Sequence, residues 1–78
     1  MTTRQALAQA IADAQRTVNA LTGEIAATRN YIAANEQALQ SQPASLRAIT
    51  EEGLAKARAN LARKEAELQI AQQTLANA

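Results

Sequence analysis

The side chains that could carry out acid-base or nucleophilic chemistry are few, and their spacing does not suit it. The 78-residue chain has no His and no Cys, which removes the usual general base, thiol nucleophiles, disulfides and thiolate metal ligands. Glu51 and Glu52 are adjacent, so on a helix their carboxylates point in different directions and cannot work as a pair. Ser41 and Ser45 have no His to activate them. We therefore expect no enzyme, with no catalytic residue and no metal site.

The glycines and the charges provide no cofactor or nucleic-acid site. Gly23 and Gly53 each stand alone in helix-forming sequence, so neither opens a loop that could bind the phosphate of a cofactor. The chain has eight Lys and Arg residues and seven Asp and Glu residues, which gives a net charge of +1. Nucleic-acid binding usually requires a basic excess on one face and aromatic side chains for base stacking. We expect no cofactor, and nucleic-acid binding is the least favoured of the functions considered below.

The composition indicates long helices. Of the 78 residues 21 are Ala, the strongest helix former, and only 14 are Leu, Ile or Val, with a single Tyr as the only aromatic residue. A chain of this length buries only about 60% of the surface that its unfolded form exposes, so its own core is small. We expect one all-α domain over residues 1–78 that associates with itself or with another protein.

Membrane-spanning and export signals are absent from the sequence. No segment approaches the ~18 consecutive apolar residues of a membrane span, and the first residues lack the apolar core of a signal peptide. We therefore expect a cytoplasmic location, which is the host cytoplasm if the chain is phage-encoded. Arg outnumbers Lys six to two and Ala dominates, a bias common in proteins from GC-rich bacterial and phage genomes.

Pro43 divides the chain into two helices. The residue before a proline is disfavoured in the helical conformation, so the first helix should end by about residue 40. The sequence predicts one helix over about 3–40, a loop over about 41–45 and a second helix over about 45–76.

Hydroxyl side chains are available to cap both helices. Thr2 and Gln5 fit a capping box at the start of the first helix. Ser45 or Ser41 is expected to cap the second helix.

Apolar residues recur at alternating spacings of four and three, which is the spacing of a coiled-coil seam. In the first helix the seam runs unbroken through Leu7, Ile11, Ala14, Val18, Leu21, Ile25, Thr28, Ile32, Asn35 and Leu39. In the second helix a leucine stands at every seventh position: Leu54, Leu61, Leu68 and Leu75. We expect these seam positions to form the buried face of each helix.

The two halves of the seam match about Pro43. Large residues lie at equal sequence distances on either side of this proline in the pairs Ile11 with Leu75, Val18 with Leu68, Ile25 with Leu61, and Ile32 with Leu54. An antiparallel hairpin brings such pairs face to face, whereas one continuous helical rod would not. The pattern therefore predicts an antiparallel two-helix hairpin.

The rotation of the second helix decides which residues fill the seam between its leucines. One rotation places Thr50, Ala57, Lys64 and Ala71 there, and the other places Glu51, Arg58, Glu65 and Gln72 there. We favour the first, because Ala allows helices to approach closely and Lys64 can extend its charged end out of the seam.

A hairpin with one seam buries each large side chain only in part. Hairpins of this kind pair into four-helix bundles or dock on another protein. We therefore expect a homodimer that forms a four-helix bundle.

Two isoleucines outside the seam mark a candidate interface on the second helix. Ile49 and Ile70 share one heptad position with Lys56 and Arg63, which predicts a contact line for dimerisation or for a partner helix. Tyr31 lies just off the seam of the first helix, and Tyr is enriched at interface hot spots. The alternative interpretation is that Ile49 belongs to the frayed first turns of the second helix, that Ile70 is a scattered surface residue, and that the Tyr ring shields the seam from water.

In length, in its two-helix layout and in the loop at Pro43, the chain resembles the small helical-hairpin chaperones of type III secretion and phage-encoded inhibitors of host proteins. The resemblance rests on layout and not on a motif, so it assigns no site residue. It implies binding of an unidentified partner protein through a rigid helical face, as an adaptor, chaperone or inhibitor. Two other functions stay open: a structural subunit of a virion or secretion apparatus, and a nucleic-acid accessory protein.

Overall fold

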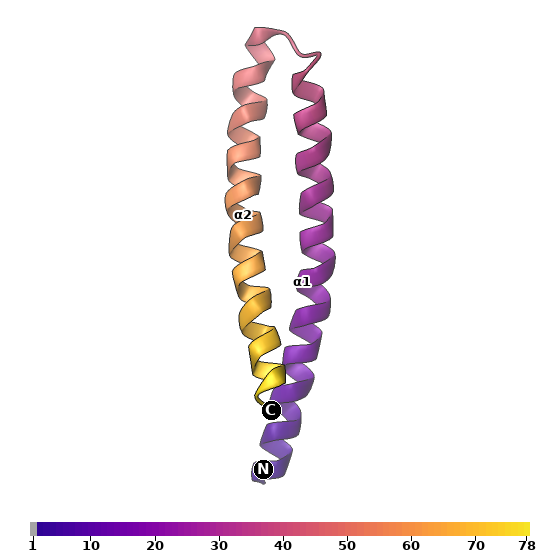
Figure 1. Cartoon of the computed structure of the whole chain (residues 1–78), viewed down its shortest axis with the longest axis vertical. Coiled ribbons are helices and arrows are strands. Elements are labelled where there is room, and N and C mark those ends of the chain that lie inside the picture. The colour runs from indigo at the N-terminus through magenta and orange to yellow at the C-terminus, as the bar shows by residue number, and fades with distance from the viewer. Residues whose placement is uncertain (1) are drawn as a thin grey trace.

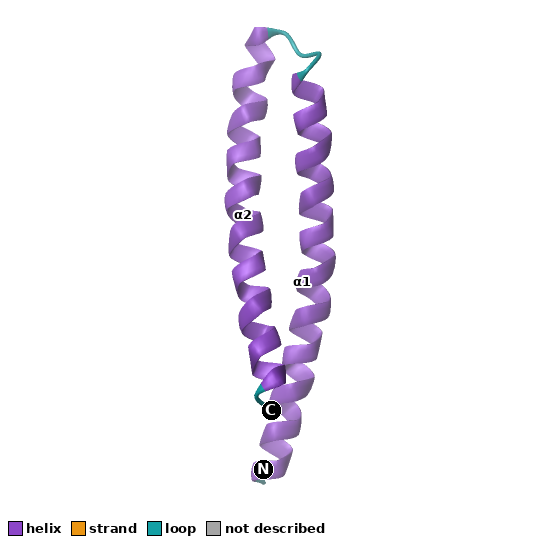
Figure 2. Cartoon of the chain, viewed as in Figure 1, coloured by secondary structure: helices purple, strands orange, loops and turns teal. Residues whose placement is uncertain are grey.

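The protein is an antiparallel pair of long α-helices, described by a computed structural model for residues 2–78 (Figure 1, Figure 2). Helix α1 spans Thr3–Leu39 and helix α2 spans Ala44–Ala76, and no strand occurs in the described part of the chain. The molecule measures 61 × 18 × 14 Å. The all-α hairpin predicted from the sequence is confirmed, and each helix boundary lies within one residue of its predicted position.

The first turn of α1 is held by the predicted capping box. The Thr2 hydroxyl accepts a hydrogen bond from the backbone N–H of Gln5 at 3.1 Å, and the Gln5 side chain accepts one from the backbone N–H of Thr2 at 2.9 Å. These two bonds satisfy backbone donors that have no partner within the helix.

The predicted serine cap of α2 is wrong. Pro43 itself is the N-cap residue, and no side chain caps the helix. The Pro43 carbonyl accepts hydrogen bonds from the backbone N–H groups of Leu46 and Arg47 at 3.0 and 3.2 Å. Because the fixed φ of proline suits the start of a helix, α2 begins directly after it, which places Ser45 inside the first turn and Ser41 before the cap.

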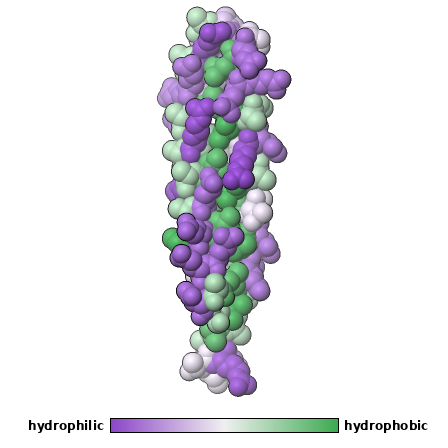
Figure 3. All heavy atoms as spheres, viewed as in Figure 1, coloured by the Kyte–Doolittle hydropathy of each residue, from purple (hydrophilic) through white to green (hydrophobic). Residues whose placement is uncertain are grey.

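The seam is the face along which the helices meet. Its most buried members are Ala14, Leu21, Ile25 and Ile32 of α1 and Leu54 and Ala71 of α2. The remaining large seam residues are half-buried, apart from Leu7: Ile11, Val18, Leu39, Leu61, Leu68 and Leu75. Figure 3 shows this pattern on one face as a narrow apolar line between hydrophilic side chains. A single seam therefore leaves most of its large residues in partial contact with water.

Leu7 was expected to be the first buried residue of the seam, but it is 51% exposed. Helix α1 continues past the end of α2, so this part of α1 has no helix to pack against (Figure 1).

Helix α2 has the rotation that the sequence favoured. Thr50, Ala57 and Lys64 are half-buried and Ala71 is buried, whereas Glu51, Arg58, Glu65 and Gln72 are exposed. The Lys64 side chain is only 15% exposed, yet its ammonium group lies 3.6 Å from the Glu24 carboxylate on α1. The aliphatic stem thus lies in the seam while the charge reaches a partner at its border.

The grooves between the helices bring together other seam residues than the symmetric pairs predicted about Pro43. Ile25 lines a shared groove with Leu68, and Val18 lines another with Leu75, each one heptad beyond the symmetric partner. Helical side chains lean toward the N-terminus of their own helix, so in an antiparallel pair they meet across Cα atoms at different heights.

Candidate interaction surface

The two broad sides of the hairpin differ in chemistry. On one side, Arg29 of α1 pairs with Glu65 of α2 at 3.3 Å, and Glu36 of α1 pairs with Arg58 of α2 at 3.1 Å. We call this the ion-paired side. All four side chains are about half exposed, so each pair contributes at most about 1 kcal/mol to stability. Their main effect is to bridge the helices across this border of the seam.

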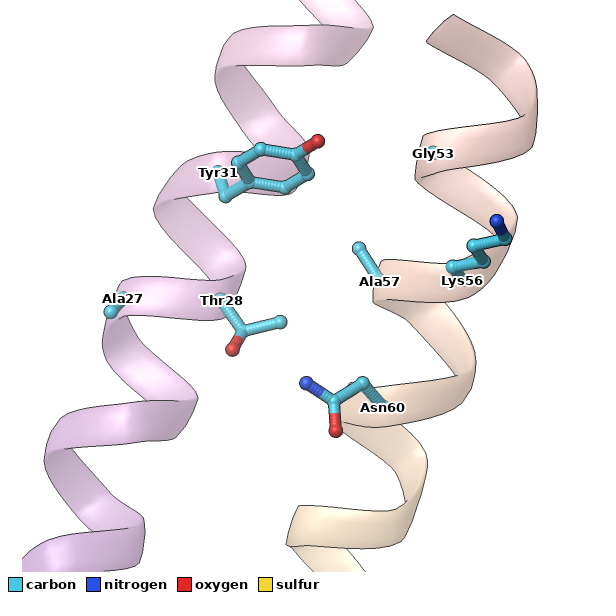
Figure 4. A pocket seen from close by; sticks show the side chains of 7 residues that line it. All are labelled: Ala27, Thr28, Tyr31, Gly53, Lys56, Ala57 and Asn60. Atoms are coloured by element: carbon cyan, nitrogen blue, oxygen red, sulfur yellow. The ribbon is translucent and has the colours of Figure 1, made fainter. Parts of the chain in front are cut away.

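The opposite border of the seam holds a shallow groove of about 620 Å³ (Figure 4). Its lining consists of Ala27, Thr28 and Tyr31 from α1 and Gly53, Lys56, Ala57 and Asn60 from α2. We call this the open side. In Figure 4 the loop end is at the top, with α1 at the left and α2 at the right, so the view is from behind the molecule as drawn in Figure 1.

Tyr31 extends across the open side toward α2 (Figure 4). Its side chain is 52% exposed, and an added Cβ at Gly53 would lie 3.5 Å from its hydroxyl oxygen. The sequence placed Tyr31 beside the seam as a contact residue or as a shield. The structure places it at the edge of the groove, facing the one position of α2 there that has no side chain.

The predicted contact line of α2 runs along the open side. Ile49 is 68% exposed, Ile70 is 63% exposed, and Lys56 and Arg63 lie exposed between them. Every seventh residue of a helix in such a pair lies on nearly the same face, and Lys56 fixes that face because it lines the groove. We call these four residues the α2 strip.

The structure brings only part of the predicted interface together. Tyr31 and Lys56 line the same groove, and Ile49 and Arg63 lie two helical turns to either side of Lys56. Ile70 is further toward the end of α2. The two basic side chains are held within α2, where Lys56 pairs with Glu52 at 3.5 Å and Arg63 pairs with Glu67 at 3.0 Å.

One apolar residue of the open side is missing from the sequence prediction. Leu46 is 46% exposed and lies three residues before Ile49, hence one turn away on the same side of α2. Its position seven residues before Gly53 is the signal that could have identified it.

Helix α1 presents a different surface on the open side. Between residues 20 and 38, the heptad positions of Ala27 and Tyr31 hold alanine apart from Glu24 and Tyr31 itself. We call this stretch the α1 strip: Ala20, Glu24, Ala27, Tyr31, Ala34 and Ala38. The Glu24 side chain is 51% exposed. The open side thus combines large and basic residues on α2 with small and acidic residues on α1.

The side chains that line the open side offer apolar contacts, a charge and hydrogen-bonding groups. Among residues 2–78, no group of three or more acidic side chains is close enough to hold a metal ion. Within the same residues, no helix is long and apolar enough to cross a membrane. Every buried side-chain polar atom of the described residues has a hydrogen-bond partner, so none points unpaired into a pocket.

Comparison with known proteins adds no family to this description. No protein-family model matches the chain, and no curated protein or solved structure is significantly similar to it.

Proposed function

We propose that the chain is a non-enzymatic interaction protein that binds a partner protein through its open side, as an adaptor, chaperone or inhibitor of bacterial or phage origin. It acts in the cytoplasm and pairs with a second copy into a four-helix bundle. One observation carries the proposal: Tyr31, Leu46, Ile49 and Ile70, the large apolar residues most exposed along the paired length of the helices, all lie on the open side.

Burial of these side chains gives the free energy for binding. Removal of apolar surface from water contributes about 25 cal/mol per Å², and burial of an exposed Ile contributes about 1.5–3 kcal/mol. Tyr and Arg are the residue types that most often dominate protein interfaces, and the open side presents Tyr31 and Arg63 among its isoleucines.

The mechanism is steric and electrostatic. The hairpin offers an elongated face along the paired length of its two helices, and ion pairs bridge the helices on the other side. A partner covered by such a face is blocked, carried or kept from aggregating, without any bond being made or broken.

The test compares capture of proteins by the wild-type chain and by two double variants. Ile49→Glu with Ile70→Glu changes the α2 strip, and the matched control, Ala55→Glu with Ala62→Glu, adds the same two carboxylates at exposed positions elsewhere on α2. Captured proteins from the cells that produce the chain are identified by mass spectrometry. We expect a specific set that the control retains and the strip variant loses.

Three outcomes would contradict the proposal. Retention of the captured proteins by the strip variant as fully as by the control would show that the open side is not the binding surface. Growth of the purified chain into rings or filaments with rising concentration would favour the structural subunit instead. Salt-sensitive binding of DNA or RNA would favour a nucleic-acid accessory protein.

A further inference from the structure

We propose that a second copy of this chain covers the open side, with the two loops at the same end of the dimer. In this arrangement the α2 strip of each copy lies on the α1 strip of its partner, and the twofold axis runs parallel to the helices. The inference rests on the proposed function in that it takes the open side as a protein-binding surface. It names the second copy as the occupant of that surface in the free protein, which a bound partner would displace.

The two strips are complementary in size. The α2 strip carries Ile49 opposite an α1 strip that is mostly alanine, so a large side chain meets small ones. Ile70 lies against Thr17, which is also small and occupies the heptad position of Tyr31. Well-packed helix pairs alternate large and small residues across the contact, which fills the space between the helices without strain. Neither strip is complementary in this way to itself, because each would then meet residues of its own size.

The two strips are also complementary in charge. Lys56 and Arg63 make the α2 strip basic, whereas the only charged residue of the α1 strip is Glu24. The Glu24 carboxylate is half exposed and the Arg63 side chain is 62% exposed, so both are accessible to a second molecule beside the partners that they have within the hairpin.

The symmetry sets the register without any adjustment. A rotation about an axis parallel to the helices does not shift a residue along the helix direction. Two residues that lie side by side in one hairpin are therefore also level with each other across the two copies. Residues equidistant from the loop then face each other: Glu24 faces Arg63, Tyr31 faces Lys56, and Ala38 faces Ile49, each within one turn. These contacts are an ion pair, a cation on an aromatic ring, and a large residue on a small one.

The opposite arrangement, with the loops at opposite ends, is disfavoured. It stacks each strip on its own copy, which brings Lys56 and Arg63 of one molecule against the same two cations of the other. Like charges across an interface weaken binding and select against that partner or orientation.

The size of the open side suits a stable dimer. A standard interface buries about 800 Å² from each partner, and the broad side of this molecule measures 61 × 18 Å. Pairing would also cover the border of the seam, where Thr28 and Ala57 line the groove and are only half-buried.

The orientation is tested by a distance between spin labels, because the chain has no native Cys to interfere. A label at Ser41→Cys in the loop should give a distance between copies within about 30 Å, since neighbouring helices in a bundle are ~10 Å apart. Loops at opposite ends would give a distance near the 61 Å length of the molecule. A control label at Gly23→Cys, near the middle of α1, gives a short distance in either dimer and confirms that a dimer is present.

The charge contact is tested by mixing two variants. Glu24→Arg and Arg63→Glu should each weaken dimerisation about tenfold, measured by sedimentation over a dilution series, because each places like charges together twice per dimer. An equimolar mixture should recover the wild-type affinity, since both contacts of the mixed dimer then join opposite charges. Circular dichroism of each variant checks that the hairpin still forms.

The outcomes separate this inference from the proposed function. A monomer at every concentration, a long Ser41 distance, or a mixture that stays as weak as its components overturns the dimer arrangement. If such a monomer still captures a partner that depends on Ile49 and Ile70, the proposed function stands and only the second copy is removed. If the chain forms a dimer with the short Ser41 distance but captures no partner, the dimer arrangement stands and the proposed function is removed.

Discussion

The ammonium group of Lys64 lies 3.6 Å from the carboxylate of Glu24 on the other helix, although the Lys64 side chain is only 15% exposed. A charged residue therefore occupies a seam position that alanine and threonine fill elsewhere on α2. Its stem packs as an apolar residue would, and its charge remains solvated only because the seam border is open at Glu24.

Lys64→Met should raise the free energy of unfolding by about 1 kcal/mol. Methionine keeps the apolar stem and removes the desolvation cost of the ammonium group, and the lost ion pair is weak because Glu24 is half exposed. Urea unfolding followed by circular dichroism at one protein concentration measures the change. Arg16→Met, at a side chain that is 69% exposed, is the control and should change stability by less than about 0.5 kcal/mol. A loss of stability in Lys64→Met would show that the ion pair matters more than its exposure indicates.

Ile25→Asp should unfold most of the molecule, whereas Leu7→Asp should leave it folded. Ile25 is 5% exposed, so the substitution puts an unpaired carboxylate in the seam and removes about 3 kcal/mol or more. Leu7 belongs to the same periodic series but is 51% exposed. Helicity measured by circular dichroism separates the two, and equal loss in both would mean that α1 packs along its whole length.

Gly23→Ala should stabilise the hairpin by up to about 1 kcal/mol, because an exposed helical glycine costs that much relative to alanine. A Cβ at Gly23 meets nothing within 4 Å, and one at Gly53 meets the Tyr31 hydroxyl at 3.5 Å, which is an ordinary van der Waals contact. Gly53→Ala should therefore stabilise as well. Thermal unfolding at matched concentration checks both variants. A lower stability of Gly53→Ala would mean that the Tyr31 hydroxyl lies closer to the added Cβ than 3.5 Å.

Thr2→Ala should loosen the first turn of α1 without lowering global stability. The substitution removes one bond of the capping box, which typically costs about 1 kcal/mol of local helix stability. The affected turn lies outside the paired length of the helices, so its opening is not coupled to the seam. Hydrogen exchange should increase for the first turns alone, with the urea midpoint unchanged; a shifted midpoint would show that the end of α1 is packed.

The fold could be predicted because its causes are local and periodic. The alternating spacing of four and three fixes the buried face of α1, and the leucines at every seventh position fix that of α2. Even the rotation of α2 followed from side-chain chemistry, since Lys64 can reach the seam border and Glu65 is better left in water. The burial of Ile25 and the exposure of Glu65 both agree with this argument.

The failures have equally specific causes. The serine cap failed because α2 begins at Ala44, directly after Pro43, so Ser45 lies inside the first turn and the cap position holds a residue with no hydroxyl. Leu7 failed because the periodic series was followed along α1 alone, although the predicted end of the second helix near residue 76 leaves no residue opposite Leu7. The open side was only half predicted: the line from Ile49 to Ile70 was visible in the sequence, but its alignment with Tyr31 depends on how the two helices face each other.

Both termini lie at the same end of the hairpin, beyond its last seam layers (Figure 1). A force that draws them apart would therefore open the molecule one layer at a time, beginning at the half-buried Ile11 and Leu75 and ending at the loop. Each step breaks few contacts, so the protein should yield at low tension when pulled from its ends. The same helices would resist far more strongly if they were sheared along their length, because every layer would then have to break together.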